Sequence, residues 1–254
     1  MKPARVLPAS AGVHRWVWDL HYPAPLSATH GYPISAVPHA TPRGPEGPLA
    51  LPGHYQVRLT VENQKLEAPL EVNPDPRVHV AVAALEEQLR LATQLATLLA
   101  DSSRALLSAR SEQAQVRALN ASGATAAALK RFAEGVEALL NAPKSAEPAA
   151  ADKASAAKPA GDQAVPAQPP VLLPALQERI AALYAEVVRG DAAPTRAQAE
   201  ATAAARQDLG GLSERWQQLQ ASLPALNTQL RAAKLAVVRA DLPPPRDANF
   251  ADEE

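Results

Sequence analysis

The first third of the chain alternates apolar and polar residues, and this pattern predicts β-strands. Residues 13–20 place Trp16, Trp18 and Leu20 at alternate positions, so we expect a strand with one strongly aromatic face. Residues 55–61 alternate in the same way and predict a half-buried strand, whose apolar side chains are Tyr55, Val57, Leu59 and Val61. The aromatic face needs a second layer to cover it.

A polar segment after residue 61 predicts a turn and a return strand. Residues 62–65 read Glu-Asn-Gln-Lys, and Asn63 tolerates the left-handed backbone that tight turns use. Residues 66–72 alternate again, and Pro69 restricts this strand to an edge or bulged position because proline lacks a backbone N–H. The Asn-Pro-Asp-Pro run at 73–76 ends the pairing and leads into helical sequence.

Beyond residue 77 the apolar residues recur at steps of three and four, which predicts amphipathic helices. Four stripes follow this spacing: Leu85, Leu89, Ala92, Ala96, Leu99, Ser103 and Leu106; Val116, Leu119, Ala126, Leu129, Ala133, Val136 and Leu140; Leu176, Ile180, Leu183 and Val187; and Leu209, Leu212, Trp216, Leu219 and Leu223, extended past Pro224 by Leu226, Leu230 and Val237. We expect an interruption at Ser122-Gly123, a stop at 190–194 and a helix cap at Thr195. Such stripes predict an antiparallel helical bundle, with a coiled-coil dimer as the alternative.

Proline divides the chain into zones. Thirteen of the 25 prolines lie in residues 1–76, whereas residues 77–142 contain none. The Ala/Pro-rich stretch that follows has too few large apolar residues to offset its ordering entropy, so we expect it to be disordered. The predicted organisation is α+β: a β unit at 1–76 with a Pro-rich loop at 23–51, a helical hairpin at 77–142, a linker at 143–173, a second helical hairpin at 174–238 that completes the bundle, and a flexible acidic tail at 239–254.

Charge, cysteine content and hydropathy exclude several classes of function. The 25 basic and 26 acidic residues give a formal net charge of −1, so no global field draws the chain to nucleic acid or to an anionic membrane. The absence of cysteine excludes disulfides, thiolate metal sites and thiol nucleophiles. No apolar run approaches the ~20 residues that a membrane-spanning helix needs. We therefore expect no nucleic-acid partner and no membrane span.

Candidate chemical groups lack the spacing that catalysis or metal binding requires. The histidines of the Pro-rich segment are too widely spaced for a zinc site; they are His21, His30, His39 and His54. The acidic residues of the β unit could act as general acid and base only in a pocket that excludes water; they are Asp19, Glu46, Glu62 and Glu71. Gly210-Gly211, expected between helical segments, lacks the Lys-Ser/Thr pair of a phosphate loop. We expect no cofactor, metal ion or catalytic residue.

Two motifs lie in the β unit, and together they resemble a known family. The first contains Gly12, His14, Arg15, Trp18, Asp19, Leu20, Tyr22 and Pro23. The second contains Pro52, Gly53, Tyr55, Val57 and Leu59, and is followed by Asp75, Pro76 and Arg77. This pattern resembles the region after the propeller in bacterial sortilin-like, BNR-repeat β-propeller proteins, often labelled glycosyl hydrolases or sialidase-like. It is also similar to the immunoglobulin-like domain of flagellar hook-capping proteins.

The resemblance implies a partial immunoglobulin-like antiparallel β unit, and the motif residues suit structural roles in it. We expect Trp18 and Tyr55 inside the unit, Asp19 accepting backbone N–H groups of the following loop, and Gly53 in a turn that enters a strand. Surface binding by Trp16 or Tyr22 is the alternative. The helical part also resembles the family's C-terminal tail, at Ala193-Pro-Thr195 and Leu223-Pro-Ala-Leu-Asn227.

The expected function is that of a non-catalytic accessory or interaction module. Because the family's propeller is absent, we expect a C-terminal piece or a free-standing subunit, whose partner is a β-propeller protein or domain, or a second copy. The other hypothesis is a fragment or subunit of a sialidase-like glycosyl hydrolase whose catalytic propeller lies elsewhere. The resemblance implies a periplasmic or secreted parent, although no export signal is recognised in this chain.

Overall fold

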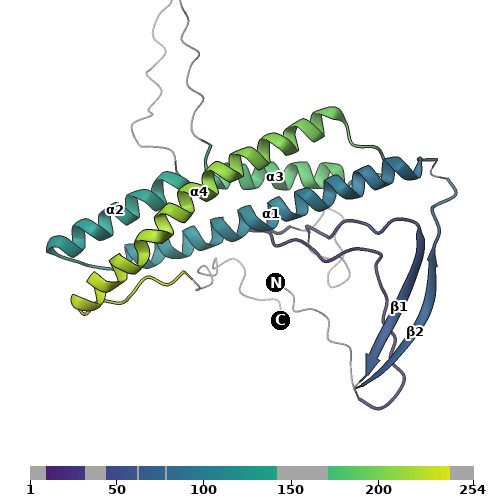
Figure 1. Cartoon of the computed structure of the whole chain (residues 1–254), viewed down its shortest axis with the longest axis horizontal. Helices are drawn as coiled ribbons and strands as arrows, with labels where there is room; N and C mark the ends of the chain where they lie inside the picture. The colour runs from purple at the N-terminus through teal and green to yellow at the C-terminus, as the bar shows by residue number, and fades with distance from the viewer. Residues whose placement is uncertain (1–9, 32–43, 62, 78, 142–170, 241–254) are drawn as a thin grey trace, which may run out of the picture.

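The computed structural model of the chain describes residues 10–31, 44–61, 63–77, 79–141 and 171–240 (Figure 1). It contains a two-stranded antiparallel sheet followed by four helices, which confirms the predicted α+β class. The strands are β1 (Gly53–Val61) and β2 (Gln64–Val72), and the helices are α1 (Val82–Arg117), α2 (Gly123–Leu140), α3 (Leu173–Val187) and α4 (Arg196–Ala232). The hairpin projects from one end of the helical part.

Several predicted segments lie outside the described residues. The predicted linker is described only from Val171 onward, and the predicted acidic tail only as far as Ala240. Within the predicted Pro-rich loop, the structure describes residues 23–31 and 44–51. Two isolated bridges, His21 with Leu49 and Gly31 with Gly44, hold the ends of that loop side by side.

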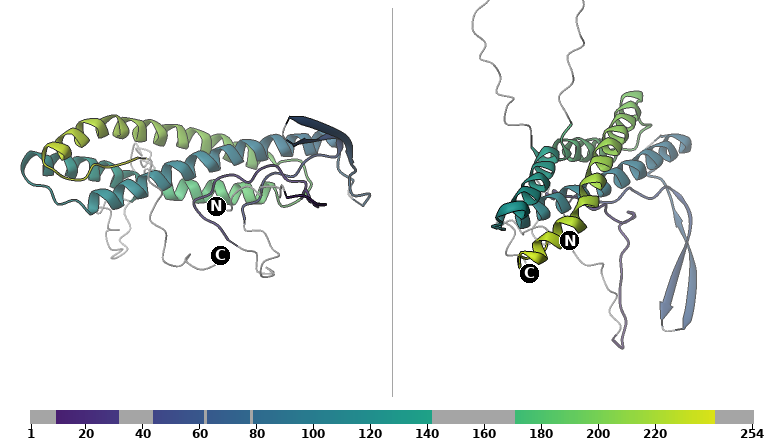
Figure 2. Two further views of the ribbon diagram at one scale, coloured as in Figure 1. Left: turned by 90° about the horizontal axis from the view of Figure 1, so that it is seen from below. Right: turned by 60° about the vertical axis from the view of Figure 1, so that its left-hand side comes forward.

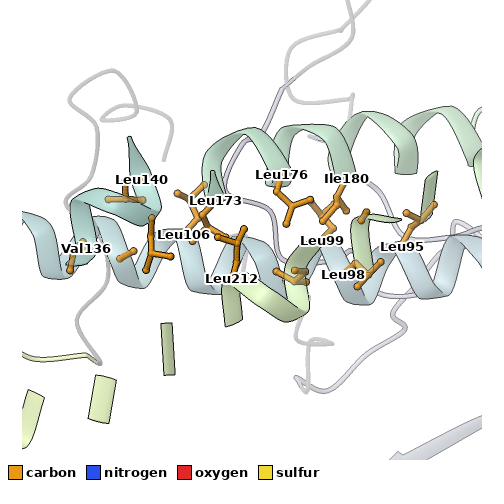
Figure 3. Close-up of a cluster of buried hydrophobic side chains, with 14 of the residues drawn as sticks. Leu95, Leu98, Leu99, Leu106, Val136, Leu140, Leu173, Leu176, Ile180 and Leu212 are labelled. Atoms are coloured by element: carbon orange, nitrogen blue, oxygen red, sulfur yellow. The ribbon is translucent and has the colours of Figure 1, made fainter. Parts of the chain in front are cut away.

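The four helices share one apolar core, and α1 contacts each of the other three. Figure 3 shows Leu95, Leu99 and Leu106 of α1 beside Val136 of α2, Ile180 of α3 and Leu212 of α4. On α1 the buried side is wider than the predicted stripe, because Leu91, Leu95 and Leu98 are buried as well. The wider face follows from packing against helices on more than one side.

Local sequence explains where α4 begins and how long it runs. The side chain of Thr195 accepts a hydrogen bond from Gln198 N at 3.2 Å, and the side chain of Gln198 accepts one from Thr195 N at 2.9 Å. This reciprocal capping box satisfies N–H groups that the first turn leaves free, as expected for Thr195. Gly210-Gly211 lies inside α4 and not between helical segments, so that prediction was wrong: buried neighbours such as Leu209 and Leu212 stabilise the helix despite the glycines.

The chain after α4 folds back along the helices instead of continuing the predicted stripe to Val237. The side-chain amide of Asn227 donates a hydrogen bond to the backbone carbonyl of Val238 and accepts one from its backbone N–H, at 2.9 Å each. The side-chain amide of Gln115 bonds the backbone carbonyl and N–H of Arg239 in the same way, at 2.7 Å each. These two amide clamps place the buried side chain of Val238 in the core, in the role that the pattern predicted for Val237.

A buried polar pair lies between α1 and α4. Glu112 is fully buried, and its two carboxylate oxygens accept hydrogen bonds from Gln220 Nε2 at 2.9 and 2.8 Å. Burial raises the pKa of the Glu112 carboxyl to about 7, and the hydrogen bond from Gln220 opposes part of that rise. A carboxyl group with this pKa changes charge within the range where most proteins are handled.

Candidate functional site

The segment that precedes β1 is held together by close backbone packing between residues 20–22 and 47–50. Tyr22 N donates to Pro48 O at 2.8 Å, and Ala50 N donates to Leu20 O at 2.7 Å. Gly47 is buried against this pairing, and a Cβ at that position would lie 1.8 Å from the carbonyl oxygen of Tyr22. Only glycine therefore fits at residue 47 without a shift of the backbone.

Tyr184 of α3 joins this segment to the helices. Its hydroxyl donates to the carbonyl oxygen of Glu46 at 2.6 Å, and its ring is almost completely buried. Burial, with a smaller contribution from the charge of Glu46, raises the pKa of the Tyr184 phenol, so the hydroxyl stays a donor at physiological pH. The contact fixes where the hairpin leaves the helical part.

The two predicted motifs meet at Trp18 and Tyr55. Their rings are 5.7 Å apart and nearly perpendicular, at 69°, which is the edge-to-face arrangement that aromatic pairs favour. Trp18 Nε1 donates to His21 O at 3.1 Å, and the Tyr55 hydroxyl donates to Leu51 O at 2.6 Å. Both rings are half-buried and not enclosed, because no second sheet covers them within the described residues.

The turn after Trp18 has the expected role for Asp19. The Asp19 carboxylate accepts a hydrogen bond from His21 N at 3.0 Å, and the intervening Leu20 has a left-handed φ of 63°. Gly53 opens β1 with a φ of 154°, a conformation that disfavours side chains, as expected for a turn entering a strand. These residues shape the backbone and do not converge on a cavity.

The other motif residues are spread over the surface. His14 Nε2 lies 2.7 Å from Ser10 O, while Gly12, Arg15 and Tyr22 are exposed. Pro52 precedes the strand, and Asp75 forms a local turn across Pro76, in which Arg77 donates from its backbone and side chain. These hydrogen bonds hold the pKa of the Asp75 carboxyl below its usual value.

The predicted strand at 13–20 is absent, which corrects that prediction. Residues 13–19 form no ladder with any described residue; Trp16 is exposed, whereas Trp18 touches Tyr55. An alternating pattern becomes a strand only when a neighbour supplies hydrogen bonds to its peptide groups. Among the described residues none does so here.

The β1–β2 hairpin carries a set of exposed apolar side chains on one face. Tyr55 lies opposite Leu70, Val57 opposite Ala68, and Leu59 opposite Leu66. We call this side the hairpin apolar face; it consists of Tyr55, Val57, Leu59, Val61, Leu66, Ala68, Leu70 and Val72. Leu59, predicted to be half-buried, is 43% exposed, and Leu66 on the return strand is 61% exposed, so apolar side chains of both strands are open to water. Figure 2 shows the hairpin standing clear of the four helices.

The acidic and histidine side chains of the described residues do not gather in an enclosed site. No group of three or more His, Asp or Glu side chains in these residues could hold a metal ion. His21 lies between Asp19 and Glu46, at 3.8 and 4.0 Å, but both carboxylates are open to water. A hollow of about 350 Å³ lies instead at the α1–α2 turn, where its lining includes Leu119, Ala126 and Leu129 and no carboxylate.

Comparison with known proteins gives no match to a family model, a curated protein or a solved structure. Among the described helices, none is both long enough and apolar enough to cross a membrane. The candidate site therefore has to be judged from its own geometry. That geometry is an exposed apolar sheet face, which the alternation of residues 55–72 marks in the sequence although its exposure is not visible there.

Proposed function

We propose that the chain is a non-catalytic interaction module and that the hairpin apolar face is its binding surface. The observation that supports this proposal is the exposure of four large aliphatic side chains on one side of the hairpin: Val57, Leu59, Val61 and Leu66. Exposed aliphatic residues are common singly, but a contiguous set on one sheet face is typical of a surface that binds a partner.

The free energy of the hairpin supports the same proposal. An isolated two-stranded hairpin is marginally stable in water, and three or more strands or a packed layer are needed for independent stability. In this chain the contact between Trp18 and Tyr55 covers only the end of the face that lies near the helices. Burial of the remaining aliphatic side chains against a partner would stabilise both the hairpin and the complex.

The family resemblance supplies the class of partner. We infer a β-propeller protein or domain of the sortilin-like, BNR-repeat type, with the hairpin acting as part of an immunoglobulin-like β unit beside it. The helices would form an antiparallel bundle that carries this unit. The hydrolase alternative would require the acid and base to come from that partner, because Asp19 and Glu46 lie in water and not in an enclosed pocket.

A binding measurement with matched variants tests this function. The ligand is a purified sortilin-like β-propeller protein encoded beside this chain, and the method is titration calorimetry. Leu59→Glu places a charge on the hairpin apolar face and should weaken binding by about tenfold or more, the effect of roughly 1.4 kcal/mol. Thr60→Glu, on the opposite side of the same strand, should leave the affinity close to that of the unmodified chain. Equal weakening by both variants, or no binding by the unmodified chain, would refute the proposal.

A hydrolysis assay tests the non-catalytic part of the proposal. The purified chain is expected to release no product from aryl-glycoside or sialoside substrates. Activity that stays with the homogeneous protein and disappears in Asp19→Asn or Glu46→Gln would establish the hydrolase alternative.

A further inference from the structure

The two outer edges of the hairpin differ in their hydrogen-bonding capacity. Val61 and Gln64 flank a two-residue turn, so this pair exchanges both ladder hydrogen bonds, and such pairs then alternate along the strands. The peptide groups that point away from β2 are consequently those of His54, Gln56, Arg58 and Thr60. We call these four residues the outer edge of β1. Among the described residues, no backbone hydrogen bond reaches it.

Proline interrupts the other edge. Pro69 lies opposite Gln56, in a pair that does not exchange ladder bonds, so its missing N–H falls on the outer side of β2. The hydrogen bonds between β1 and β2 are unaffected. A strand added to the outer side of β2, however, would find no backbone N–H donor at Pro69. Only β1 presents an uninterrupted edge for strand addition.

We propose that β1 pairs with β1 of a second copy of this chain, antiparallel, around a two-fold axis that passes through Val57. This inference rests on the proposed function in that it makes the hairpin the interaction site, and it names a second copy as the molecule at its edge. Val57 is the midpoint of Gly53–Val61, so this register uses the whole strand. It also sets each outward peptide group opposite another, Gln56 facing Arg58 and His54 facing Thr60 of the second copy.

The side chains are self-complementary in this register. A two-fold axis perpendicular to the sheet keeps both apolar faces on one side, so Tyr55 lies beside Leu59 of the second copy and Val57 beside its equivalent. On the other side Arg58 faces Gln56 of the second copy. Arg58 is already paired with Glu67, at 2.7 Å between Nε and Oε1, so no like charges are opposed.

Other registers are worse. A register centred on Arg58 would bring two guanidinium groups directly opposite each other, which is destabilising. A register centred on Gln56 would shift the overlap off the end of the strand, so that Thr60 would face Pro52, which has no N–H to donate. The register centred on Val57 joins two hairpins into a four-stranded sheet with one continuous apolar face, wide enough to be covered as a unit.

Cysteine scanning of the full chain tests the register directly, because the chain has no cysteine of its own. At the two-fold axis, two copies of residue 57 would form a non-hydrogen-bonded pair with Cα atoms about 4.5 Å apart, within the range of a disulfide. Val57→Cys should therefore give a disulfide-linked dimer under mild oxidation on non-reducing gels. Leu66→Cys, on β2 and away from the axis, should form no disulfide-linked dimer and should run as the monomer on the same gels.

Proline scanning tests the edge. The unmodified chain should elute at twice the mass of the 26.7 kDa monomer in size-exclusion chromatography with light scattering. Thr60→Pro removes a donor from the outer edge of β1 and should give the monomer mass. Lys65→Pro removes one from the outer side of β2, directly opposite, and should leave the dimer intact.

The outcomes separate this inference from the proposed function. A monomeric chain without selective cross-linking through residue 57 would overturn the second-copy pairing, even if it bound the β-propeller protein through Leu59. A dimer that cross-links through residue 57 but ignores the β-propeller protein would support the pairing and refute that function. A dimer that survives Thr60→Pro and dissociates in Lys65→Pro would overturn the choice of edge.

Discussion

The helical part and the β1–β2 hairpin use equally strong apolar patterns, yet they reach opposite degrees of burial. Leu99 and Ile180 in the helices are completely buried (Figure 3). In the hairpin, by contrast, Leu59 and Leu66 are open to water. The difference lies in the number of layers. Each helix packs against at least two others, while the hairpin has two strands and no described layer over most of its apolar face. A periodic pattern therefore specifies which side of an element is apolar, and tertiary neighbours decide whether that side is buried.

The stability of the isolated chain therefore comes mainly from its helices. Apolar burial is the dominant favourable contribution to folding, and almost all of the buried apolar side chains belong to α1–α4. In the proposed function, the hairpin uses its exposed apolar side chains for contacts between molecules. The helices would then supply the stability of the fold, and the hairpin would supply the binding surface.

Truncation of one leucine in each region should give the largest difference. Leu99→Ala creates a cavity among four helices and should lower the free energy of unfolding by about 2–5 kcal/mol. Leu59→Ala removes a side chain that is already in water and should change it by about 0.5 kcal/mol or less, measured at protein concentrations where the chain is monomeric. Urea denaturation followed by circular dichroism at 222 nm compares the two; similar losses would show that the hairpin face is covered in the free chain.

The buried Glu112 should make the helical part sensitive to pH. Because its folded-state pKa of about 7 is above its unfolded value of 4.5, the folded state binds the proton more tightly. The stabilising contribution is fully present below pH 4.5 and is lost as the pH rises through 7. Compared with a residue that does not titrate, Glu112 should lower the free energy of unfolding at high pH by at most about 3 kcal/mol.

Glu112→Gln isolates this effect from other ionisable groups. The variant should gain stability relative to the unmodified chain as the pH is raised from 4.5 to 7, and the difference should level off above pH 7, in urea denaturation at a series of pH values. Measurements that report on the hairpin should not show the same dependence on pH. A difference between the two proteins that does not vary with pH would contradict the raised pKa.

The smallest effect is expected at the junction between the two regions. Tyr184→Phe removes the hydrogen bond to Glu46 O and should cost about 1 kcal/mol. Hydrogen exchange should become faster at the amides of Tyr22 and Ala50, which pair in this segment, while amides of the α1 core keep their protection. Faster exchange throughout α1 would show that the two regions unfold together.

The helices and the existence of the hairpin could be predicted from the sequence because their determinants are local. The three-four spacing of Leu99 and Leu106 marks the buried side of α1, and Thr195 with Gln198 marks the start of α4. The hairpin itself was also predicted, but its turn was placed at residues 62–65, whereas the structure pairs Val61 with Gln64 and starts β2 at Gln64. None of these features depends on a distant segment.

The features that sequence reasoning missed depend on distant segments. The aromatic alternation at 13–20 has no strand to pair with among the described residues, so it forms no ladder with them. Glu112 occupies a position in line with the apolar stripe of α1, three residues after Ala109, and that spacing could have marked it as buried. Its partner Gln220 is 108 residues away, and no local pattern identifies that pairing.

The amide clamps at Asn227 and Gln115 have a consequence for how this protein can vary. Asn227 binds the backbone N–H and C=O of Val238, and Gln115 binds those of Arg239 while also donating to the Ser111 hydroxyl at 3.3 Å, so the two clamps hold residues 238 and 239 by their backbone and not by their side chains. Proline, which lacks the N–H that each clamp requires, is the one residue type they exclude. As far as the clamps are concerned, residue 239 can be any amino acid except proline, and residue 238 any apolar one. Gln115 of α1 and Asn227 of α4, although they are polar, should tolerate few substitutions because both ends of their amide groups are used.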